Sequence, residues 1–299
     1  MTQDQWRCSV ESSSRNEPLY ATASLVSAWL LIEQPGAWGP DALIESKFPA
    51  SIARELERRS GRVRVLLIRH RSTRRGDPVF FKAHSGGNGV GPSLVSASLS
   101  DPALLLDVDF DALAEGDVGP GQEIDRPIYL VCTHGRHDVC CADRGRPLYR
   151  ALSPIRPERT WEVSHLGGDR FAGNLLVLPR GDYFGRVEPD EVETLVSNYE
   201  SGRIDISHHR GRSSQPRLVQ AAEFFLREAE GITGFDDLVV TDYHRLDHDH
   251  ADVVFRREED VVAVSVRARR VDEPRSLTCR ADQAAYPVSY DLVSITRTR

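Results

Sequence analysis

The sequence has few lysines, a negative net charge and no long apolar run, and each of these features argues against a class of protein. Only Lys47 and Lys82 are lysines, so nearly all of the basic charge is arginine. The formal net charge is −7, which argues against a protein that binds nucleic acid by neutralising phosphates. No apolar run approaches the roughly 20 residues that a membrane-spanning helix needs, and the N-terminus lacks the profile of a signal peptide. We therefore expect a soluble, cytoplasmic protein that binds neither nucleic acid nor membrane.

Cysteine is also scarce, and its distribution is uneven. The chain has 5 cysteines and 10 histidines. Three of the cysteines lie in the segment 132–141, which also holds two histidines, and His165 follows two dozen residues later. An odd number of cysteines, crowded together in a protein of a reducing compartment, indicates metal or redox chemistry rather than a disulfide framework.

The distribution of glycine and proline predicts three units. The run at 116–122 is typical of a boundary. It separates an N-terminal α/β unit at 17–115 from a second unit at 121–210, and an extension at 211–299 contributes a long helix, a β-hairpin and further strands. Residues 1–16 are polar, and we expect them to be loosely ordered.

Hydrophobic patterns and helix-end signals predict the elements of the first two units. In the first unit they are a strand at 27–33, a helix at 49–60, strands at 62–69 and 78–83, and a Gly/Ser-rich loop at 85–98. In the second unit they are a strand at 127–132, a helix around 147–152, strands at 160–165 and 175–179, and a helix at 189–200. The order strand, helix, strand, strand, helix is typical of a small thioredoxin-like α/β unit. Because the first unit begins with the same order, it is a candidate degenerate repeat without ligands.

The cysteines and histidines fall where such folds place functional groups. Cys132 ends a buried strand, and His165 ends another. Cys141 falls on the following loop or helix start, where a thiolate is favoured. Gly167 and Gly168 allow a tight turn before Asp169, which can reach the same metal ion as His165. These residues predict a metal centre or a reactive thiol.

The same motifs carry a resemblance to a known family. They are Cys132-Thr-His-Gly-Arg-His-Asp-Val-Cys-Cys141, His165-Leu-Gly-Gly-Asp-Arg-Phe-Ala-Gly-Asn174, Leu178-Pro-Arg-Gly181, Arg210-Gly-Arg-Ser213 and Trp29-Leu-Leu-Ile-Glu-Gln-Pro-Gly-Ala-Trp-Gly39. In these segments the chain resembles the sucrase/ferredoxin-like family from about residue 22 to residue 223. The resemblance implies a thioredoxin-like ferredoxin domain that binds a [2Fe–2S] cluster.

The resemblance also implies a ligand set, from which this sequence departs. Family members that bind the cluster use two cysteines, matching Cys132 and Cys141, and two histidines in a His-x-Gly-Gly-His motif. His165 matches the first histidine, but Asp169 stands in place of the second. Either Asp169 ligates iron directly, or a neighbour such as His134, His137 or Cys140 takes the fourth position, or the site is empty.

Formal charge predicts how carboxylate ligation would affect a cluster. With two thiolates, one imidazole and one carboxylate, the oxidised cluster carries one negative charge. That charge lies between those of all-cysteine and Rieske-type sites, so we expect a reduction potential between roughly −400 mV and about −150 mV. We also expect lability, because protonation of His165 or Asp169 removes a ligand.

We expect some of the other residues to support the cluster and others to have no chemical role. Arg170, Asn174 and His134 are candidate cofactor-binding residues. Arg170, Asn174 and Arg212 could line the rim of the cluster and donate to its sulfurs, His134 could hydrogen-bond the loop or a ligand, and Arg170 could instead pair with Asp138. Cys140 is expected to be a packed spectator. Cys8 and Cys279 lie outside every motif and are expected to be inert.

Three other segments give weaker signals. The segment 243–250 alternates Asp and His and could bind zinc or nickel, although a solvated loop explains it equally well. His208 and His209 are expected on a surface loop. The glycines of 86–91 are expected in a flexible loop rather than in a phosphate-binding motif.

The favoured hypothesis is an electron-transfer protein that carries a [2Fe–2S] cluster on Cys132, Cys141, His165 and Asp169 and exchanges electrons with a redox partner protein. A second hypothesis is a thiol–disulfide or peroxide-handling enzyme that uses Cys132 with Cys140 or Cys141. A third is a cluster-free relative that acts as a binding module.

Overall fold

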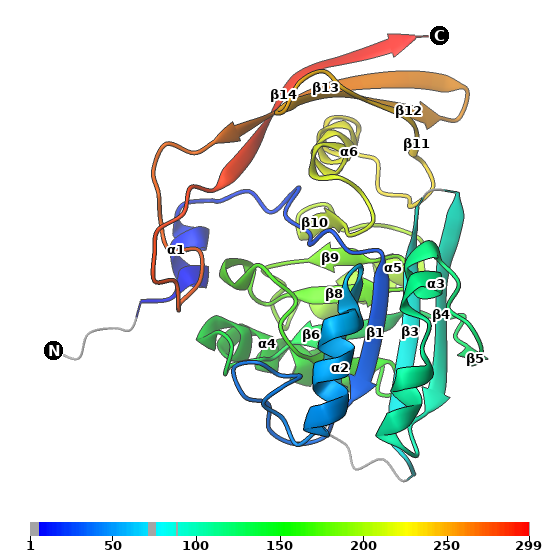
Figure 1. The fold of residues 1–299 in the computed structure, drawn as a ribbon. Coiled ribbons are helices and arrows are strands. Elements are labelled where there is room, and N and C mark those ends of the chain that lie inside the picture. Colours follow the sequence, from blue (N-terminus) through cyan, green and yellow to red (C-terminus); the bar gives the residue numbers. More distant parts are fainter. Residues whose placement is uncertain (1–5, 71–75, 88, 299) are drawn as a thin grey trace, which may run out of the picture.

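The chain folds around one large β-sheet, and a smaller sheet lies near the C-terminus (Figure 1). The computed structural model describes residues 6–70, 76–87 and 89–298. In these ranges the large sheet has 10 strands, in the order β10-β9-β8-β6-β7-β2-β1-β3-β4-β5, and the small sheet has 4, in the order β11-β12-β13-β14. This architecture confirms the predicted α/β class.

The elements follow one another in three groups. The first group is α1 (Cys8–Ser14), β1 (Ala28–Glu33), α2 (Ala50–Ser60), β2 (Val63–Arg69), β3 (Val79–Gly87), β4 (Val90–Ser98), the 3-10 helix η1 (Pro102–Asp107) and α3 (Phe110–Glu115). The second is β5 (Gln122–Glu123), β6 (Ile128–Cys132), α4 (Val139–Ile155), β7 (Thr160–Val163), the 3-10 helix η2 (Asp169–Phe171), β8 (Leu175–Leu178), β9 (Asp182–Phe184) and α5 (Val192–Glu200). The third is β10 (His209–Arg212), α6 (Arg217–Glu230), β11 (Val239–Arg245), β12 (His250–Arg257), β13 (Asp260–Arg270) and β14 (Val288–Thr298).

The large sheet consists of two halves with the same topology. In one half β1 is parallel to β2 and antiparallel to β3, and β3 pairs antiparallel with β4. In the other half β6 is parallel to β7 and antiparallel to β8, and β8 pairs antiparallel with β9. The halves meet where β2 and β7 pair antiparallel, with Ile68 opposite Val163. This arrangement supports the hypothesis of a degenerate repeat.

The alternation of side chains along β6 determines which way Cys132 faces. Every residue of β6 is buried, and successive side chains point to opposite faces of the sheet. Tyr129 and Val131 pack in the core that α4 and α5 cover. Leu130 and Cys132 belong to the other core, which continues across the join between the halves as far as Trp29.

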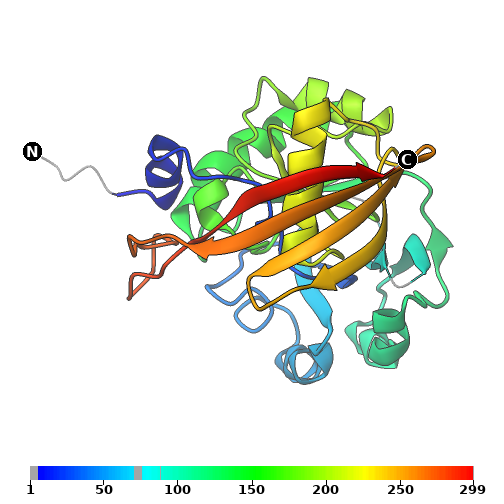
Figure 2. The same ribbon diagram turned by 90° about the horizontal axis from the view of Figure 1, so that it is seen from above.

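The C-terminal extension packs its small sheet on α6. The apolar face of α6, including Ala222 and Leu226, contacts Val253, Phe255 and Val264 of the small sheet. Figure 2 shows the strands β12, β13 and β14 crossing over α6. The long helix and the β-hairpin predicted for the extension are therefore confirmed, as α6 and as the pair β12 and β13.

Three local predictions are wrong. The segment 85–98, expected as a loop, contains the end of β3 and all of β4, because its glycines allow a hairpin rather than break the sheet; Asn88 lies outside the described residues. Residues 8–14 of the polar N-terminus form α1. His209 is not on a surface loop: it begins β10 and is 8% exposed.

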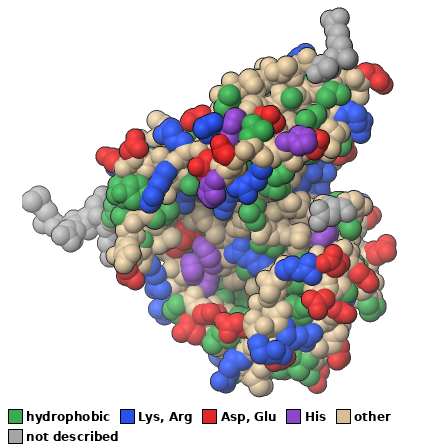
Figure 3. All heavy atoms as spheres, turned by 45° about the horizontal axis from the view of Figure 1, so that its top comes forward, with side chains coloured by type: hydrophobic (Ala, Val, Ile, Leu, Met, Phe, Trp, Pro, Cys, Tyr) green, Lys and Arg blue, Asp and Glu red, His purple; other side chains and the backbone are tan. Residues whose placement is uncertain are grey.

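The surface carries interspersed charges. Figure 3 shows acidic and basic side chains mixed over the face that it displays. None of the helices in the described ranges is both long enough and apolar enough to cross a bilayer.

A buried carboxylate links β9, β10 and α5. Asp182 is fully buried, and it accepts hydrogen bonds from Tyr199 at 2.8 Å and His209 at 3.1 Å. Arg180 and Arg212 lie 3.3 and 3.9 Å away. Burial opposes ionisation, but His209 and the two guanidinium groups outweigh it and hold the pKa of Asp182 well below its usual range. The family motifs around Arg180 and Arg212 therefore have a structural role.

Replacing Asp182 tests this network. Because its pKa is depressed in the folded protein, Asp182 stabilises the fold fully above the unfolded value of about 3.9, and this stability is lost as pH falls through the folded pKa. We expect Asp182→Asn to lower the free energy of unfolding by about 3 kcal/mol at pH 7, and by less in acid. Denaturant titrations at several pH values measure this, with exposed Asp260→Asn as the control. Equal losses at neutral and acidic pH would contradict the explanation.

Candidate metal centre

The sheet brings Cys132 and His165 to the same edge. Cys132 is the last residue of β6, and it is in register with Val163, the last residue of the parallel strand β7. Because parallel strands end at the same edge of a sheet, His165, two residues beyond Val163, lies beside Cys132. Cys132 is 1% exposed, whereas the His165 side chain is 25% exposed.

Helix α4 brings the second thiol to this edge. Asp138 caps the helix by accepting a hydrogen bond from the Cys140 N–H at 2.8 Å, and Cys141 then faces Cys132. The helix packs very closely on the end of β6, because a Cβ added to Gly145 would lie 1.9 Å from the carbonyl oxygen of Cys132. Only glycine allows this approach.

The four predicted ligands converge. The ligand atoms of Cys132, Cys141 and His165 all lie within 4.8 Å of one another. Asp169 Oδ1 lies 3.1 Å from Cys141 Sγ and 2.9 Å from His165 Nδ1. His137, His165 and Asp169 form a second group of the same compactness, which shares His165 with the first.

The imidazole of His165 faces the other donors without a fully formed hydrogen bond. Its Nδ1 is buried and has no hydrogen bond of normal geometry, although Asp169 Oδ1 is 2.9 Å away. This orphaned buried nitrogen, with two thiols and a carboxylate beside it, fits a metal group that accepts mixed sulfur, nitrogen and oxygen ligands.

A buried arginine holds the loop that carries Asp169. Gly168 has φ of +79°, and a Cβ there would lie 2.3 Å from Arg210 Nη2. Arg210 donates to the carbonyl of Gly167 at 3.0 Å and to Asn174 Oδ1 at 2.8 Å. Asn174 in turn donates to the Gly168 carbonyl at 2.8 Å. The motifs at 165–174 and 210–213, which lie far apart in the sequence, therefore both hold this loop in place.

The four side chains hold their protons with different strengths. The hydrogen bond from Cys141, together with His165, lowers the pKa of Cys132 well below its usual range, and the same Cys132 contact raises the pKa of Cys141. Burial lowers the pKa of His165, but Asp169 and Cys132 outweigh burial and raise it to about 9. Burial opposes ionisation of Asp169, but His165 outweighs it and lowers the pKa. The arrangement is a thiolate, an imidazolium and a carboxylate in series.

The other two histidines of the motif border the centre. The ring of His137 stacks on that of His165 with centroids 3.7 Å apart, and burial lowers the pKa of His137. His134 Nε2 lies 2.7 Å from the Gly39 carbonyl oxygen, and its backbone N–H donates to the Cys132 sulfur. His137 is therefore placed as an alternative fourth ligand, and His134 supports Cys132.

Arg170 and Arg212 contact residues outside the candidate metal centre. Arg170 donates to Glu17 Oε1 at 2.9 Å, which ties η2 to the segment after α1. The suggested pair of Arg170 with Asp138 is wrong, because Asp138 instead caps α4. Arg212 belongs to the network around Asp182. The proposed tuning of cluster sulfurs by Arg170 and Asn174 stays a prediction.

A cavity gives access to the histidine side of the centre. It has a volume of about 320 Å³, and its lining includes His134, His137 and His165 together with the loop at 40–43 and part of β2. Cys132 and Cys141 are not among its lining residues. On this side, therefore, the imidazole groups rather than the sulfurs border the cavity.

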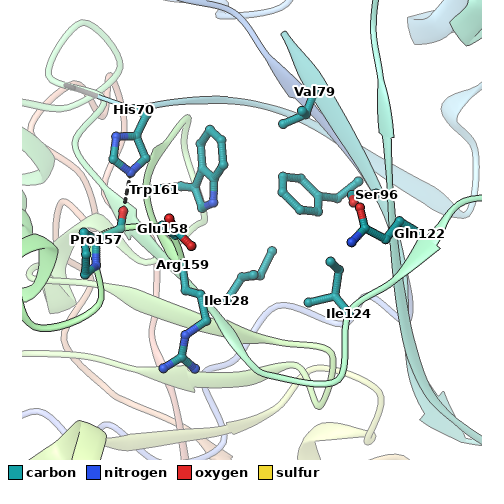
Figure 4. Close-up of a pocket in the computed structure, with 11 residues that line it drawn as sticks. His70, Val79, Ser96, Gln122, Ile124, Ile128, Pro157, Glu158, Arg159 and Trp161 are labelled. Carbon is teal, nitrogen blue, oxygen red and sulfur yellow. Dashed lines mark hydrogen bonds between the residues drawn. The ribbon is translucent and has the colours of Figure 1, made fainter. Parts of the chain in front are cut away.

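A larger cavity, of about 580 Å³, lies at the join of the two halves (Figure 4). Phe81, Ile128 and Trp161 form an apolar part of its wall, and His70 contacts the Pro157 carbonyl at its rim. By the strand registers, Glu33 and His70 take the places in the first half that Cys132 and His165 take in the second. The first half therefore keeps the geometry of the repeat without its thiols.

Cys8 and Cys279, which lie outside every sequence motif, form a second group with Cys140. Cys8, Cys140 and Cys279 meet beside Asp138, although they lie far apart along the chain. Cys140 is packed, as expected, but it packs against the other two thiols, and the expected inertness of Cys8 and Cys279 stays a prediction. No motif spacing could have joined them, because the contact depends on how both ends of the chain fold back on α4. The Asp/His tract at 243–250 joins no such group in the described ranges.

The sequence model of the family described as sucrase/ferredoxin-like matches residues 19–211. The chain is 32% identical over 101 residues to Altered inheritance of mitochondria protein 32 of Meyerozyma guilliermondii, a match that covers 30% of this chain and 36% of that protein. It is 33% identical over 113 residues to the protein of the same name from Eremothecium gossypii, covering 33% and 36%. The chain thus spans about a third of the length of these curated relatives.

Among solved structures, the chain is similar to a thioredoxin-like [2Fe–2S] ferredoxin from Aquifex aeolicus. The match covers 31% of this chain and 97% of that one, with 17% identity and a TM-score of 0.28. A variant of the same ferredoxin matches 26% of this chain and 89% of its own, with 20% identity and a TM-score of 0.23.

The close approach of α4 to β6 gives a prediction about this centre. Gly145→Ala places a methyl group against a backbone carbonyl that has no rotamer to escape into. We expect the free energy of unfolding to fall by about 2–3 kcal/mol, as for overpacked cores, and metal binding to weaken because Cys141 shifts away from Cys132. Chemical denaturation and metal titration measure the two effects. Gly91→Ala, where the added Cβ meets open space, is the control and should change stability by less than about 0.5 kcal/mol.

Proposed function

The chain belongs to the sucrase/ferredoxin-like family, and on that premise we propose that it carries a [2Fe–2S] cluster and works as a one-electron carrier. The observation that supports this most directly is the convergence of two thiols, one imidazole and one carboxylate on a buried point at the edge of the sheet. When bound, such a cluster takes up and releases single electrons. The protein's residues hold it, tune its potential and limit access to it.

We assign the ligands by their place in the two overlapping groups. Cys132 and Cys141 supply thiolates from β6 and α4, and His165 and Asp169 supply a nitrogen and an oxygen from the loop that Arg210 holds. This pattern resembles Rieske centres, in which two thiolates bind one iron and two other groups bind the second. Cys140 is excluded as the fourth ligand because its sulfur lies in the other thiol group. His137 remains the alternative to Asp169.

The surroundings favour a potential above that of all-cysteine ferredoxins. The N–H of His134 donates to the Cys132 sulfur, and such bonds stabilise the more negative, reduced state. The buried guanidinium of Arg210 adds positive charge behind the loop of Asp169. The exposed edge of His165 opens into the cavity beside it, so we propose that a redox partner protein docks there.

A thiol enzyme is the second candidate, and one observation favours it. Cys132, His165 and Asp169 form a series in which the thiol pKa is depressed and the imidazole pKa is raised, as in cysteine nucleophiles. However, Cys132 is 1% exposed and does not line the adjacent cavity, so a substrate has no route to its sulfur. The same buried thiolate is well suited to ligate a metal.

Anaerobic purification tests the proposal. We expect the full chain to contain two irons and two acid-labile sulfides, to absorb visible light, and to give an EPR signal of spin one half after reduction by one electron. Cys132→Ser and Cys141→Ser should each lose iron. Protein that stays colourless and iron-free after cluster reconstitution would refute it, and a reversible Cys132–Cys141 disulfide in such protein would support the thiol enzyme instead.

Replacement of Asp169 separates it from His137 as a ligand. We expect Asp169→His to keep the cluster and raise its potential by on the order of 100 mV, because a neutral ligand replaces an anionic one. Asp169→Ala should lose iron, whereas His137→Ala should keep it. Protein-film voltammetry and iron analysis measure these effects, and exposed Asp190→His is the matched control, with no expected shift. Retention of iron in Asp169→Ala together with its loss in His137→Ala would transfer the ligand role to His137.

A further inference from the structure

The N-terminal helix, the start of α4 and the loop between β13 and β14 meet at one point. Figure 1 shows α1 beside the loop that leads into β14. At this junction Cys8 Sγ lies 3.6 Å from Cys140 Sγ and 3.5 Å from Cys279 Sγ. Cys140 Sγ and Cys279 Sγ are 3.3 Å apart. The sulfurs form a nearly equilateral triangle.

We propose that Cys8, Cys140 and Cys279 bind one soft divalent cation of the zinc type, with the Asp138 carboxylate as the fourth ligand. Tetrahedral zinc with Zn–S bonds of about 2.3 Å separates its sulfur ligands by about 3.8 Å, close to the spacing of this triangle. A disulfide requires about 2.0 Å between sulfurs, and all five cysteines are free. The spacing therefore fits a single ion.

The buried carboxylate distinguishes this group from three thiols that merely pack together. Asp138 is fully buried, and both of its oxygens lie 3.9 Å from Cys8 Sγ. It accepts hydrogen bonds from the N–H groups of Cys140 at 2.8 Å and Cys279 at 2.6 Å. No ion pair to Asp138 is found in the described part of the chain. Buried charges are normally paired or ligate metals, and the lone pairs that accept from the Cys8 thiol become free for a cation when that thiol loses its proton.

Two further donors point at the sulfurs. The Ser9 hydroxyl donates to Cys140 Sγ at 3.2 Å, and the Cys8 N–H donates to Cys279 Sγ at 3.4 Å. Such bonds stabilise thiolates, the form in which cysteine binds metals. Cys8 and Cys140 are buried, whereas Cys279 is partly exposed, so an ion can enter from the side of the C-terminal loop. Binding exchanges the three thiol protons for the cation and releases them to solvent, with no change of oxidation state.

The site would join three parts of the chain that lie far apart in the sequence. It connects the N-terminal α1, the helix α4 that carries Cys141, and the C-terminal loop. The inference does not depend on the [2Fe–2S] proposal, because the two ligand sets share no residue.

Zinc analysis of the full chain tests the inference. We expect one tightly bound zinc per chain, and Co²⁺ in its place should give the visible ligand-field bands of a tetrahedral, thiolate-rich site. Cys8→Ser and Cys279→Ser should each weaken zinc binding by about 100-fold or more. Their iron content and EPR signal should match those of the wild type. Circular dichroism establishes that each variant is folded.

The matched control removes the thiols of the other centre. Cys132→Ser combined with Cys141→Ser should keep the full equivalent of zinc, which excludes zinc bound adventitiously in the first site. Three results would each overturn the inference: folded wild-type protein that binds neither zinc nor cobalt, unchanged zinc affinity in Cys8→Ser, or a disulfide between two of the three cysteines in protein isolated under reducing conditions.

Discussion

The start of helix α4 is the constraint on which both thiol groups depend. Successive helical residues point about 100° apart, so the adjacent Cys140 and Cys141 face different sides of the helix. Cys141 meets Cys132 in the core beneath the sheet edge, and Cys140 meets Cys8 and Cys279. Asp138 fixes the helix start, and Gly145 lets the helix reach the end of β6.

The two halves share one topology but differ in the side chains at the corresponding edge, and among the described residues the thiols lie at the edge of the second half. Both halves place the ends of two parallel strands side by side, and this edge is where α/β folds collect functional groups. In the first half Glu33 accepts a hydrogen bond from the Val79 N–H, and His70 contacts a backbone carbonyl. In the first half these side chains therefore contact backbone groups of the sheet and of the join between the halves. The second half has thiol and imidazole groups at the corresponding edge.

Much of this could be predicted from sequence, for local reasons. Short-range patterns and family motifs predict the strand at 127–132 and the candidate ligands Cys132, Cys141 and His165. The structure brings these three side chains together with Asp169. The hairpin at 85–98 was missed because its glycines resemble a loop until the partner strand is known. The role of Arg210 was missed because its partners, Gly167 and Asn174, lie some 40 residues away and only the fold joins them. The Cys8–Cys140–Cys279 group was missed for the same reason over longer distances.

The central claim is that the protein holds a [2Fe–2S] cluster with a single histidine ligand. Nitrogen hyperfine spectroscopy of the reduced full chain, labelled with ¹⁵N only at histidine, tests it most directly. The account predicts strong coupling to one imidazole nitrogen, which Asp169→His should increase to two. Absence of any coupled histidine nitrogen would contradict the account, and so would two in the unmodified protein.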